Sequence, residues 1–127
     1  MKGKRGEGAA AEEAACRWLK GQGCEILARN LYFEHGEIDI LLRDGEYLVF
    51  AEVKMRSEKY ISRYGRPSAA VNPEKERHLR DTANEYLRSH PTSLIPRIDV
   101  IEAVTTELPG GWVSFALTRM CAASRRY

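Results

Sequence analysis

The chain alternates between segments whose hydrophobic positions recur every three to four residues and segments in which they recur every second residue. The first pattern predicts amphipathic helices, and the second predicts half-buried strands. One helix is predicted over residues 6–20, because its apolar positions follow helical spacing and a glycine ends the run. A second helix is predicted from Asn72 to about Arg88, because an N-cap residue is followed there by a proline at the first helical position.

Five further segments have the composition and period of strands. They are Glu25–Asn30, Glu37–Leu42, Tyr47–Lys54, Arg97–Ala103 and Trp112–Leu117. Residues 57–71 have no clean period and contain glycine and proline, which predicts a mobile loop, and residues 118–127 fit no predicted element. We therefore expect a single α/β domain over residues 1–127, with a mixed central sheet of about five strands flanked by helices.

The dipeptide Asp44–Gly45 is typical of a two-residue hairpin turn, and such a turn fixes the register of its strands. The expected cross-strand pairs are Arg43 with Glu46, Leu41 with Leu48, Asp39 with Phe50, and Glu37 with Glu52. Since side chains alternate, one face is expected to be wholly apolar and to belong to the core. That face carries Ile38, Ile40, Leu42, Val49, Ala51 and Val53. The other face carries Glu37, Asp39, Leu41, Leu48, Phe50, Glu52 and Lys54.

Charged side chains gather at the end of this second face, away from the turn. The carboxylates of Glu37, Asp39 and Glu52 would repel one another unless a divalent cation lay between them. Lys54 beside a metal and a phosphate can orient or deprotonate a water and stabilise charge on phosphorus. Glu7 lies four residues before Ala11 on the inward stripe of the first helix and is a further candidate acid. The simpler alternative is a solvated sheet end where Lys54 only forms a cross-strand ion pair.

Composition adds little until the positions of the charges are considered. The 127 residues are 43% hydrophobic and 30% charged, with a net charge of +2, which fits one compact domain. Residues 54–80 contain eight basic and three acidic residues, with Tyr60 and Tyr64 among them. This segment predicts phosphate contacts, although an ordinary solvated face is the alternative. The expected nucleic-acid-binding residues are Arg56, Lys59, Arg63, Arg66 and Lys75.

No segment is apolar for long enough to predict a membrane helix, and the basic N-terminus lacks the apolar stretch of a signal peptide. We therefore expect a soluble cytoplasmic protein. Cys16, Cys24 and Cys121 are scattered and form no CxxC spacing. Neither a disulfide framework nor a structural zinc site is indicated, and buried thiols are expected.

The order of these residues resembles a known class of enzymes. Asp39, followed by Glu52-Val53-Lys54 on the next strand and preceded by a helix with an acid, resembles the PD-(D/E)xK nuclease superfamily. The chain resembles more closely the bacterial YraN-like family of uncharacterised, endonuclease-like proteins, which is itself similar in fold to archaeal Holliday junction resolvases. The resemblance is carried by Gly6-Glu7 with Ala10, Ala28-Arg29-Asn30, Gly36-Glu37-Ile38-Asp39, Val49-Phe50-Ala51-Glu52-Val53-Lys54, Gly65-Arg66-Pro67, Ala70-Val71, Lys75 and Arg97-Ile98-Asp99-Val100.

The resemblance implies a restriction-endonuclease-like fold and a site that uses Mg²⁺ or Mn²⁺. It implies Asp39 and Glu52 as metal ligands, Lys54 as the catalytic lysine, and Glu7 as an accessory acid. The expected function is a metal-dependent endonuclease, a hydrolase of DNA phosphodiester bonds. Branched or otherwise structured DNA is one substrate class, and the sequence leaves the DNA structure, and DNA versus RNA, open. A nucleic-acid-binding module that does not cleave is one alternative, and a structural or partner-binding domain is another. DNA is the expected partner, and a homodimer is left open.

Overall fold

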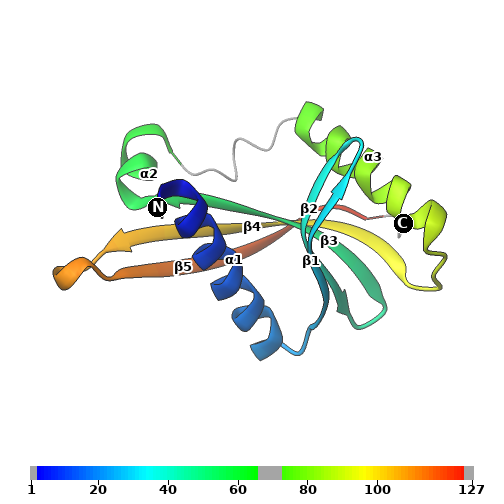
Figure 1. Ribbon diagram of the computed structural model, residues 1–127, viewed down its shortest axis with the longest axis horizontal. Helices are drawn as coiled ribbons and strands as arrows, with labels where there is room; N and C mark the ends of the chain where they lie inside the picture. Colours follow the sequence, from blue (N-terminus) through cyan, green and yellow to red (C-terminus); the bar gives the residue numbers. More distant parts are fainter. Residues whose placement is uncertain (1–2, 66–72, 125–127) are drawn as a thin grey trace.

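The computed structural model describes residues 3–65 and 73–124, and of residues 3–7, 73, 75, 123 and 124 it describes the backbone only. Five strands form one sheet in the order β1-β2-β3-β4-β5 (Figure 1). They are β1 (Glu25–Phe33), β2 (Gly36–Asp44), β3 (Tyr47–Ser57), β4 (Ile95–Glu107) and β5 (Val113–Ser124). This is the expected five-stranded sheet.

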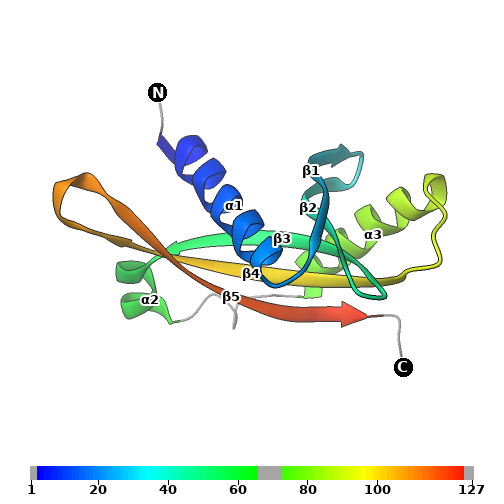
Figure 2. The ribbon, with the colours of Figure 1, turned by 90° about the horizontal axis from the view of Figure 1, so that it is seen from below.

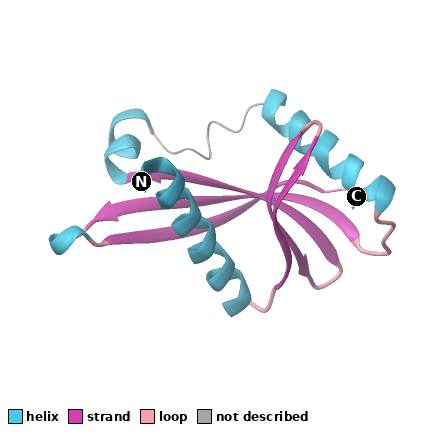
Figure 3. Ribbon diagram, in the orientation of Figure 1, coloured by secondary structure: helices cyan, strands magenta, loops and turns pink. Residues whose placement is uncertain are grey.

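The sheet is mixed because one of its connections runs through helices. Neighbouring strands are antiparallel except for β3 and β4, which are parallel. A parallel pair needs a long crossover, and here the crossover contains α2 (Glu58–Tyr64) and α3 (Pro73–Ser89). With α1 (Gly3–Gly21), the described residues form a mixed α/β fold flanked by helices, consistent with the expected restriction-endonuclease-like class (Figure 3).

Each face of the sheet is covered by one long helix, so the protein has two apolar clusters. On one face, α1 presents Ala15, Cys16 and Leu19 at helical spacing, and they pack against buried residues of β2, β3 and β4. The cluster includes Ile40, Leu42, Val49, Ala51 and Ile101. Burying a side chain as large as Leu19 stabilises a fold by roughly 1.5–3 kcal/mol. The helix position is therefore fixed by this face.

The second cluster lies under α3. Leu79 and Ala83 of α3 pack with Ile38, Leu41, Leu48, Phe50 and Ile98 of the sheet. The ring of Tyr86 meets Phe50 edge-on, with centroids 5.7 Å apart, and stacks on His90 at 4.0 Å. The face that carries Leu41, Leu48 and Phe50 is thus core near the turn, whereas its other end carries the acids.

The predicted register of the β2–β3 hairpin is wrong: each residue of β2 pairs with a β3 residue two positions later in the chain than predicted. The turn residues are Gly45 and Glu46, so Asp44 pairs with Tyr47 and Leu41 with Phe50. Gly45 takes a φ of +61°, a conformation that suits glycine at this turn position. Because the shift moves each pair by two positions, the same side chains still share a face.

Ile38 is the exception to the predicted faces. It was expected beside Ile40 and Leu42, but it belongs to the cluster under α3. The reason is that β2 pairs with β3 only up to Ile40–Ala51. Beyond this pair, β2 follows β1 alone, and the β1–β2 hairpin rises away from β3, β4 and β5 (Figure 2). The alternation of β2 side chains between the two faces of the sheet therefore does not continue to the tip of the β1–β2 hairpin.

Two other predictions also fail. Residues 58–64, expected in a mobile loop, form α2, whose N-cap Ser57 accepts a hydrogen bond from the Tyr60 backbone N–H at 3.0 Å. Residues 118–124 of the segment left without an element belong to β5, which pairs with β4 as far as Ser124. Residues 66–71 of the predicted loop and residues 125–127 lie outside the described parts of the chain.

Two of the three cysteines are buried, as expected. Burial raises the pKa of the Cys16 and Cys24 thiols, which makes both poor nucleophiles. The prediction is wrong for Cys121, which is exposed on β5. Its strand is at the edge of the sheet. Within the described ranges, no helix has the length and apolar character needed to cross a membrane.

Candidate active site

The candidate site lies at the fork where β2 separates from β3. Continuing the hairpin register would bring Asp39 opposite Glu52, just past the last printed pair of Ile40 with Ala51. At this point the side chain of Asp39, and no longer a backbone carbonyl of β2, accepts a hydrogen bond from β3. The Val53 N–H donates to Oδ2 of Asp39 at 2.8 Å. A strand amide left without an acceptor at a fork would be costly, so this bond both fixes Asp39 and completes β3.

Three other carboxylates surround Asp39. Glu37 is on β2, Glu52 is on β3, and Glu12 comes from α1 with its side chain 18% exposed. The amide of Asn30 joins two of these acids. With its nitrogen facing them, it donates to Oε1 of Glu12 at 3.1 Å and to Oε2 of Glu37 at 3.3 Å. The site is thus assembled from α1, β1, β2 and β3.

Burial and the nearby negative charges raise the pKa of two of these carboxylates, Asp39 and Glu12. Burial raises the pKa of Asp39 to about 7, and repulsion from Glu12, Glu37 and Glu52 adds to the shift, while the Val53 hydrogen bond opposes it. The pKa of Glu12 is also raised, chiefly by burial and further by Glu37, against the opposing effects of Asn30 and Arg29. An additional positive charge at this place would be strongly favoured.

A lysine lies beside the acids. Nζ of Lys54 is 3.6 Å from Oε1 of Glu52, and both side chains are largely covered. On the neighbouring strand, the parallel register sets Glu102 next to Lys54, and Glu102 is only 4% exposed. Sequence reasoning did not single out Glu102, because its place beside Lys54 depends on the pairing of β3 with β4.

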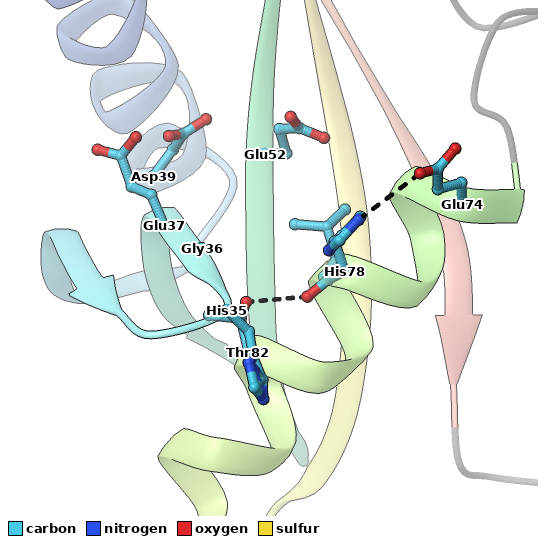
Figure 4. Close-up of a pocket in the computed structure, with 9 residues that line it drawn as sticks. His35, Gly36, Glu37, Asp39, Glu52, Glu74, His78 and Thr82 are labelled. Atoms are coloured by element: carbon cyan, nitrogen blue, oxygen red, sulfur yellow. Dashed lines mark hydrogen bonds and ion pairs between the residues drawn. The ribbon is translucent and has the colours of Figure 1, made fainter.

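The acids form one wall of an open cleft of about 390 Å³. Figure 4 shows the carboxylates of Glu37, Asp39 and Glu52 turned towards the same end of this cleft. The other lining residues come from the β1–β2 turn and from α3, and they are His35, Gly36, Glu74, His78, Leu79 and Thr82. The cleft is therefore bounded by acids on two strands and by a mixed polar surface on α3.

The wall on α3 is held close to the hairpin. Nε2 of His78 is 4.0 Å from Oε1 of Glu74, and the Thr82 hydroxyl donates to the His78 carbonyl at 2.8 Å. Gly36 permits the close approach, because a Cβ there would lie 3.1 Å from Oγ1 of Thr82 and its φ is +151°. His35 and His78, both exposed, line the cleft.

The donor set is chemically suited to a hard divalent cation, since Mg²⁺ and Mn²⁺ prefer carboxylate oxygens and are often held by one or two of them. A cation would also relieve the repulsion that raises the pKa of Asp39. Across the residues that the structure describes, no three Asp, Glu, His or Cys side chains already stand in ligand geometry. Binding by Asp39 and Glu52 would thus need waters, phosphate oxygens or small side-chain rotations to complete the shell.

The structure brings Asp39, Glu52 and Lys54 together, as the sequence predicted. Glu7 is in α1, but its side chain is outside the described part of the chain. Among the described side chains of α1, Glu12 acts electrostatically on Asp39, and sequence reasoning missed it. A signal was present, because Glu12 lies four residues before Cys16 and seven before Leu19, on the buried stripe of the helix.

The predicted nucleic-acid-binding residues divide into two groups. Arg56 ends the same face of β3 that carries Lys54, and Lys59 and Arg63 are on α2, where both are exposed. Lys75 is in α3, although its side chain is not described, and Arg66 lies outside the described residues. The described basic side chains therefore lie just beyond the acids along β3.

The fold and the site define a mixed α/β protein with an acidic cleft at a sheet fork. The sequence profile of the uncharacterised protein family UPF0102 matches residues 11–103, a span that contains Lys54 and the four acids at the fork, Glu12, Glu37, Asp39 and Glu52. The chain belongs to this family.

Individual relatives agree with this assignment. A UPF0102 protein of Alcanivorax borkumensis is 41% identical over 91 residues, which is 72% of this chain and 70% of the relative. A UPF0102 protein of Symbiobacterium thermophilum is 44% identical over 96 residues, or 75% and 79% of the two chains. One of Ralstonia nicotianae is 40% identical over 101 residues and 78% of each chain.

Proposed function

We propose that this protein is a nuclease that depends on a divalent metal and hydrolyses phosphodiester bonds of DNA. The observation that carries the proposal is the gathering of Glu12, Glu37 and Glu52 around a half-buried Asp39, whose pKa is raised to about 7, with Lys54 beside Glu52. A fold gains nothing in stability from such an arrangement unless a cation joins it. A site with chemistry to perform is the better explanation.

Asp39 and Glu52 would hold the metal, with Glu12 and Glu37 close enough to bind waters of its shell. When bound, Mg²⁺ or Mn²⁺ would neutralise phosphate charge and lower the pKa of a water. The chain contributes the positions. Asp39 is held by the Val53 N–H at 2.8 Å, so one carboxylate of the pair is already oriented before any ligand arrives. Such preorganisation lowers the entropic cost of reaching the reactive geometry.

Lys54 would act on the nucleophile and on the phosphate. Its ammonium lies 3.6 Å from Glu52, and this contact keeps the lysine close to the proposed metal ligands. From there it can orient the attacking water and stabilise charge that gathers on phosphorus. Both roles depend on the position of Nζ and go beyond simple charge neutralisation.

The choice of DNA is supported by the charges beyond the acids. Arg56 follows Lys54 on the same face of β3, and Lys59 and Arg63 are exposed on α2 directly after the strand. Cations in a row next to an acidic metal site suit a polyanion that must be held while one of its phosphates is cleaved. The chain length between these residues and Lys54 is short enough for one strand of DNA to contact both.

The experiment that tests the proposal compares Lys54→Met with the parent on branched, nicked and linear DNAs, each with Mg²⁺ and with Mn²⁺. We expect the variant to fold and to cleave at least about 10²-fold more slowly, the scale of losing a positioned charge-stabilising or acid–base group. Lys20→Met, at an exposed lysine in the last turn of α1, is the matched control and should cleave like the parent.

Calorimetric titration with Mn²⁺ separates chemistry from metal binding. The parent and Lys54→Met should bind Mn²⁺ alike, whereas Asp39→Asn and Glu52→Gln should bind it much more weakly. A Lys54→Met variant that cleaves at the parent rate would exclude the role given to Lys54. A parent that binds several DNAs and cleaves none of them would favour the non-cleaving nucleic-acid-binding module instead.

A further inference from the structure

The short helix α2 presents two tyrosine rings to solvent. Tyr60 and Tyr64 are four residues apart and so lie on one side of the helix. Their ring centroids are 4.9 Å apart with the planes at 45°, and they are 40% and 67% exposed. Large aromatic surfaces are normally buried in a fold or covered by a partner. This pair is therefore a candidate contact surface.

Positive charge surrounds the two rings. The guanidinium of Arg56 lies 5.2 Å from the centroid of Tyr60, and that of Arg63 lies 5.8 Å from the centroid of Tyr64. These cation–π contacts keep the charged groups beside the rings. Lys59 is exposed on the same helix. The surface thus offers aromatic faces for stacking together with cations that suit phosphate oxygens.

The helix is anchored to the sheet in spite of its length. Ser57 caps its first turn, and the Gly65 N–H donates to the Ile61 carbonyl at 2.8 Å after its last turn. The hydroxyl of Thr106 on β4 donates to Oε2 of Glu58 at 3.0 Å. This bond directs the acid of α2 to the neighbouring strand, so the aromatic side of the helix keeps its positive character.

The position of α2 relates the tyrosines to the acidic cleft. Glu52, Lys54 and Arg56 alternate along one face of β3, and α2 begins directly after Ser57. At about 3.3 Å per residue, Ser57 lies roughly 10 Å beyond Lys54. Along a duplex axis each strand carries a phosphate about every 3.4 Å, and a single strand is more extended, so α2 would meet the strand within about three nucleotides of the phosphate at Lys54.

We infer that Tyr60 and Tyr64 form a platform on which unpaired bases of the DNA stack beside the cleavage site. In a duplex, bases are stacked on one another and present only their edges and the phosphates, whereas unpaired bases can stack on aromatic side chains. The inference rests on the proposed function, because it takes the strand in the cleft to be DNA. It defines the substrate class as DNA with a single-stranded segment next to the scissile phosphate.

The test compares two single strands that differ only in their bases. Affinity for a short oligothymidylate and for an abasic strand of the same length is measured by fluorescence anisotropy, with metal chelated so that cleavage plays no part. Tyr60→Ala and Tyr64→Ala should each weaken oligothymidylate binding by about ten-fold. Both variants should bind the abasic strand like the parent. Tyr60→Phe and Tyr64→Phe should retain most of the affinity, since they keep the ring.

Two control variants isolate stacking from other effects. Tyr32→Ala removes a tyrosine that is 75% exposed on β1, a strand that lies away from α2 in Figures 1 and 2, and should change neither affinity. Arg63→Gln should weaken binding of both strands and reduce the salt dependence of log affinity by about 0.7 units of slope for one lost phosphate contact on a single strand.

The outcomes separate this inference from the proposed function. If both tyrosine variants bind oligothymidylate as tightly as the parent, or lose equal affinity for the abasic strand, the stacking platform is excluded while cleavage stands. If the parent cleaves duplex DNA and does not bind either single strand, the inference again fails alone. If the parent binds no DNA at all and cleaves none, the proposed function fails together with it.

Discussion

Two aspartates in this protein lie in opposite electrostatic surroundings. Asp39 at the fork is surrounded by Glu12, Glu37 and Glu52. Asp99 on β4 is only 1% exposed and is surrounded by arginines. Both carboxylates belong to strands of the same sheet, yet among the side chains that the structure describes only Asp99 has cations at hydrogen-bonding distance. The comparison separates an acid whose charge is compensated by neighbouring arginines, Asp99, from an acid whose described neighbours are other acids, Asp39.

The compensated acid is held by several bonds. Arg97 donates to the two oxygens of Asp99 at 2.9 and 2.8 Å, and Nε of Arg119 donates to Oδ2 at 2.6 Å. Nη2 of Arg119 is also 2.8 Å from Oδ2 of Asp44. Burial alone would lower the pKa of Arg97 and of Arg119, but the hydrogen bonds to Asp99 and its negative charge together outweigh burial, so both pKa values are raised. This network therefore has a structural role, because it joins side chains of different strands.

The largest expected change in the free energy of unfolding comes from a substitution at Asp99. Asp99→Asn would leave Arg97 and Arg119, whose side chains are 17% and 16% exposed, without the buried carboxylate that pairs them. Removing one partner from a buried ion pair destabilises a protein by about 3–5 kcal/mol. Urea unfolding at pH 7 measures the change. A loss below about 1 kcal/mol would show that this network does not hold the sheet together.

An effect of opposite sign is expected at Asp39. Its pKa is about 7 in the folded protein and about 3.9 in an unfolded chain. Between these values the folded state binds more protons than the unfolded state, so the free energy of unfolding falls as pH rises from about 4 to about 7. For one proton the slope is at most about 1.4 kcal/mol per pH unit.

The matched variant is Asp39→Asn, whose amide can still accept the Val53 N–H but carries no charge. It should lack this part of the pH dependence and be more stable than the parent at pH 8 in the presence of a chelator. Saturating Mn²⁺ should remove the difference by stabilising the parent alone. Parallel stability curves for parent and variant from pH 4 to 8 would show that Asp39 is not poised as described.

Part of the site could be predicted from the sequence, because successive side chains of a strand alternate between the two faces of the sheet. Asp39, Glu52 and Lys54 share a face for any hairpin register of the same parity, and so an error in the turn left them together. Glu12 could not be identified in the same way, since only the fold decides which part of α1 lies near the fork.

The compensated network was not predictable by the same means. Arg119 is in the middle of a segment with no clear strand pattern, because a charged residue there points towards Asp99 inside the fold. Its partner is 20 residues away in the chain, and pairing of β4 with β5 brings the two together. The helix α2 was missed for another reason: seven residues are too few to show a helical period.

The parallel pairing of β3 with β4 has a consequence for the order of folding. The four acids at the fork, Glu12, Glu37, Asp39 and Glu52, come from one helix and an antiparallel meander within residues 12–52, whereas β4 joins β3 only after residues 58–94 have closed a long loop. We expect pulsed hydrogen exchange to show protection of β2 and β3 amides before those of β5, and the reverse order would contradict this. On this pathway the acids proposed to bind metal are brought together first, and the bonds from Arg97 and Arg119 to Asp99 then stabilise a sheet that already contains them.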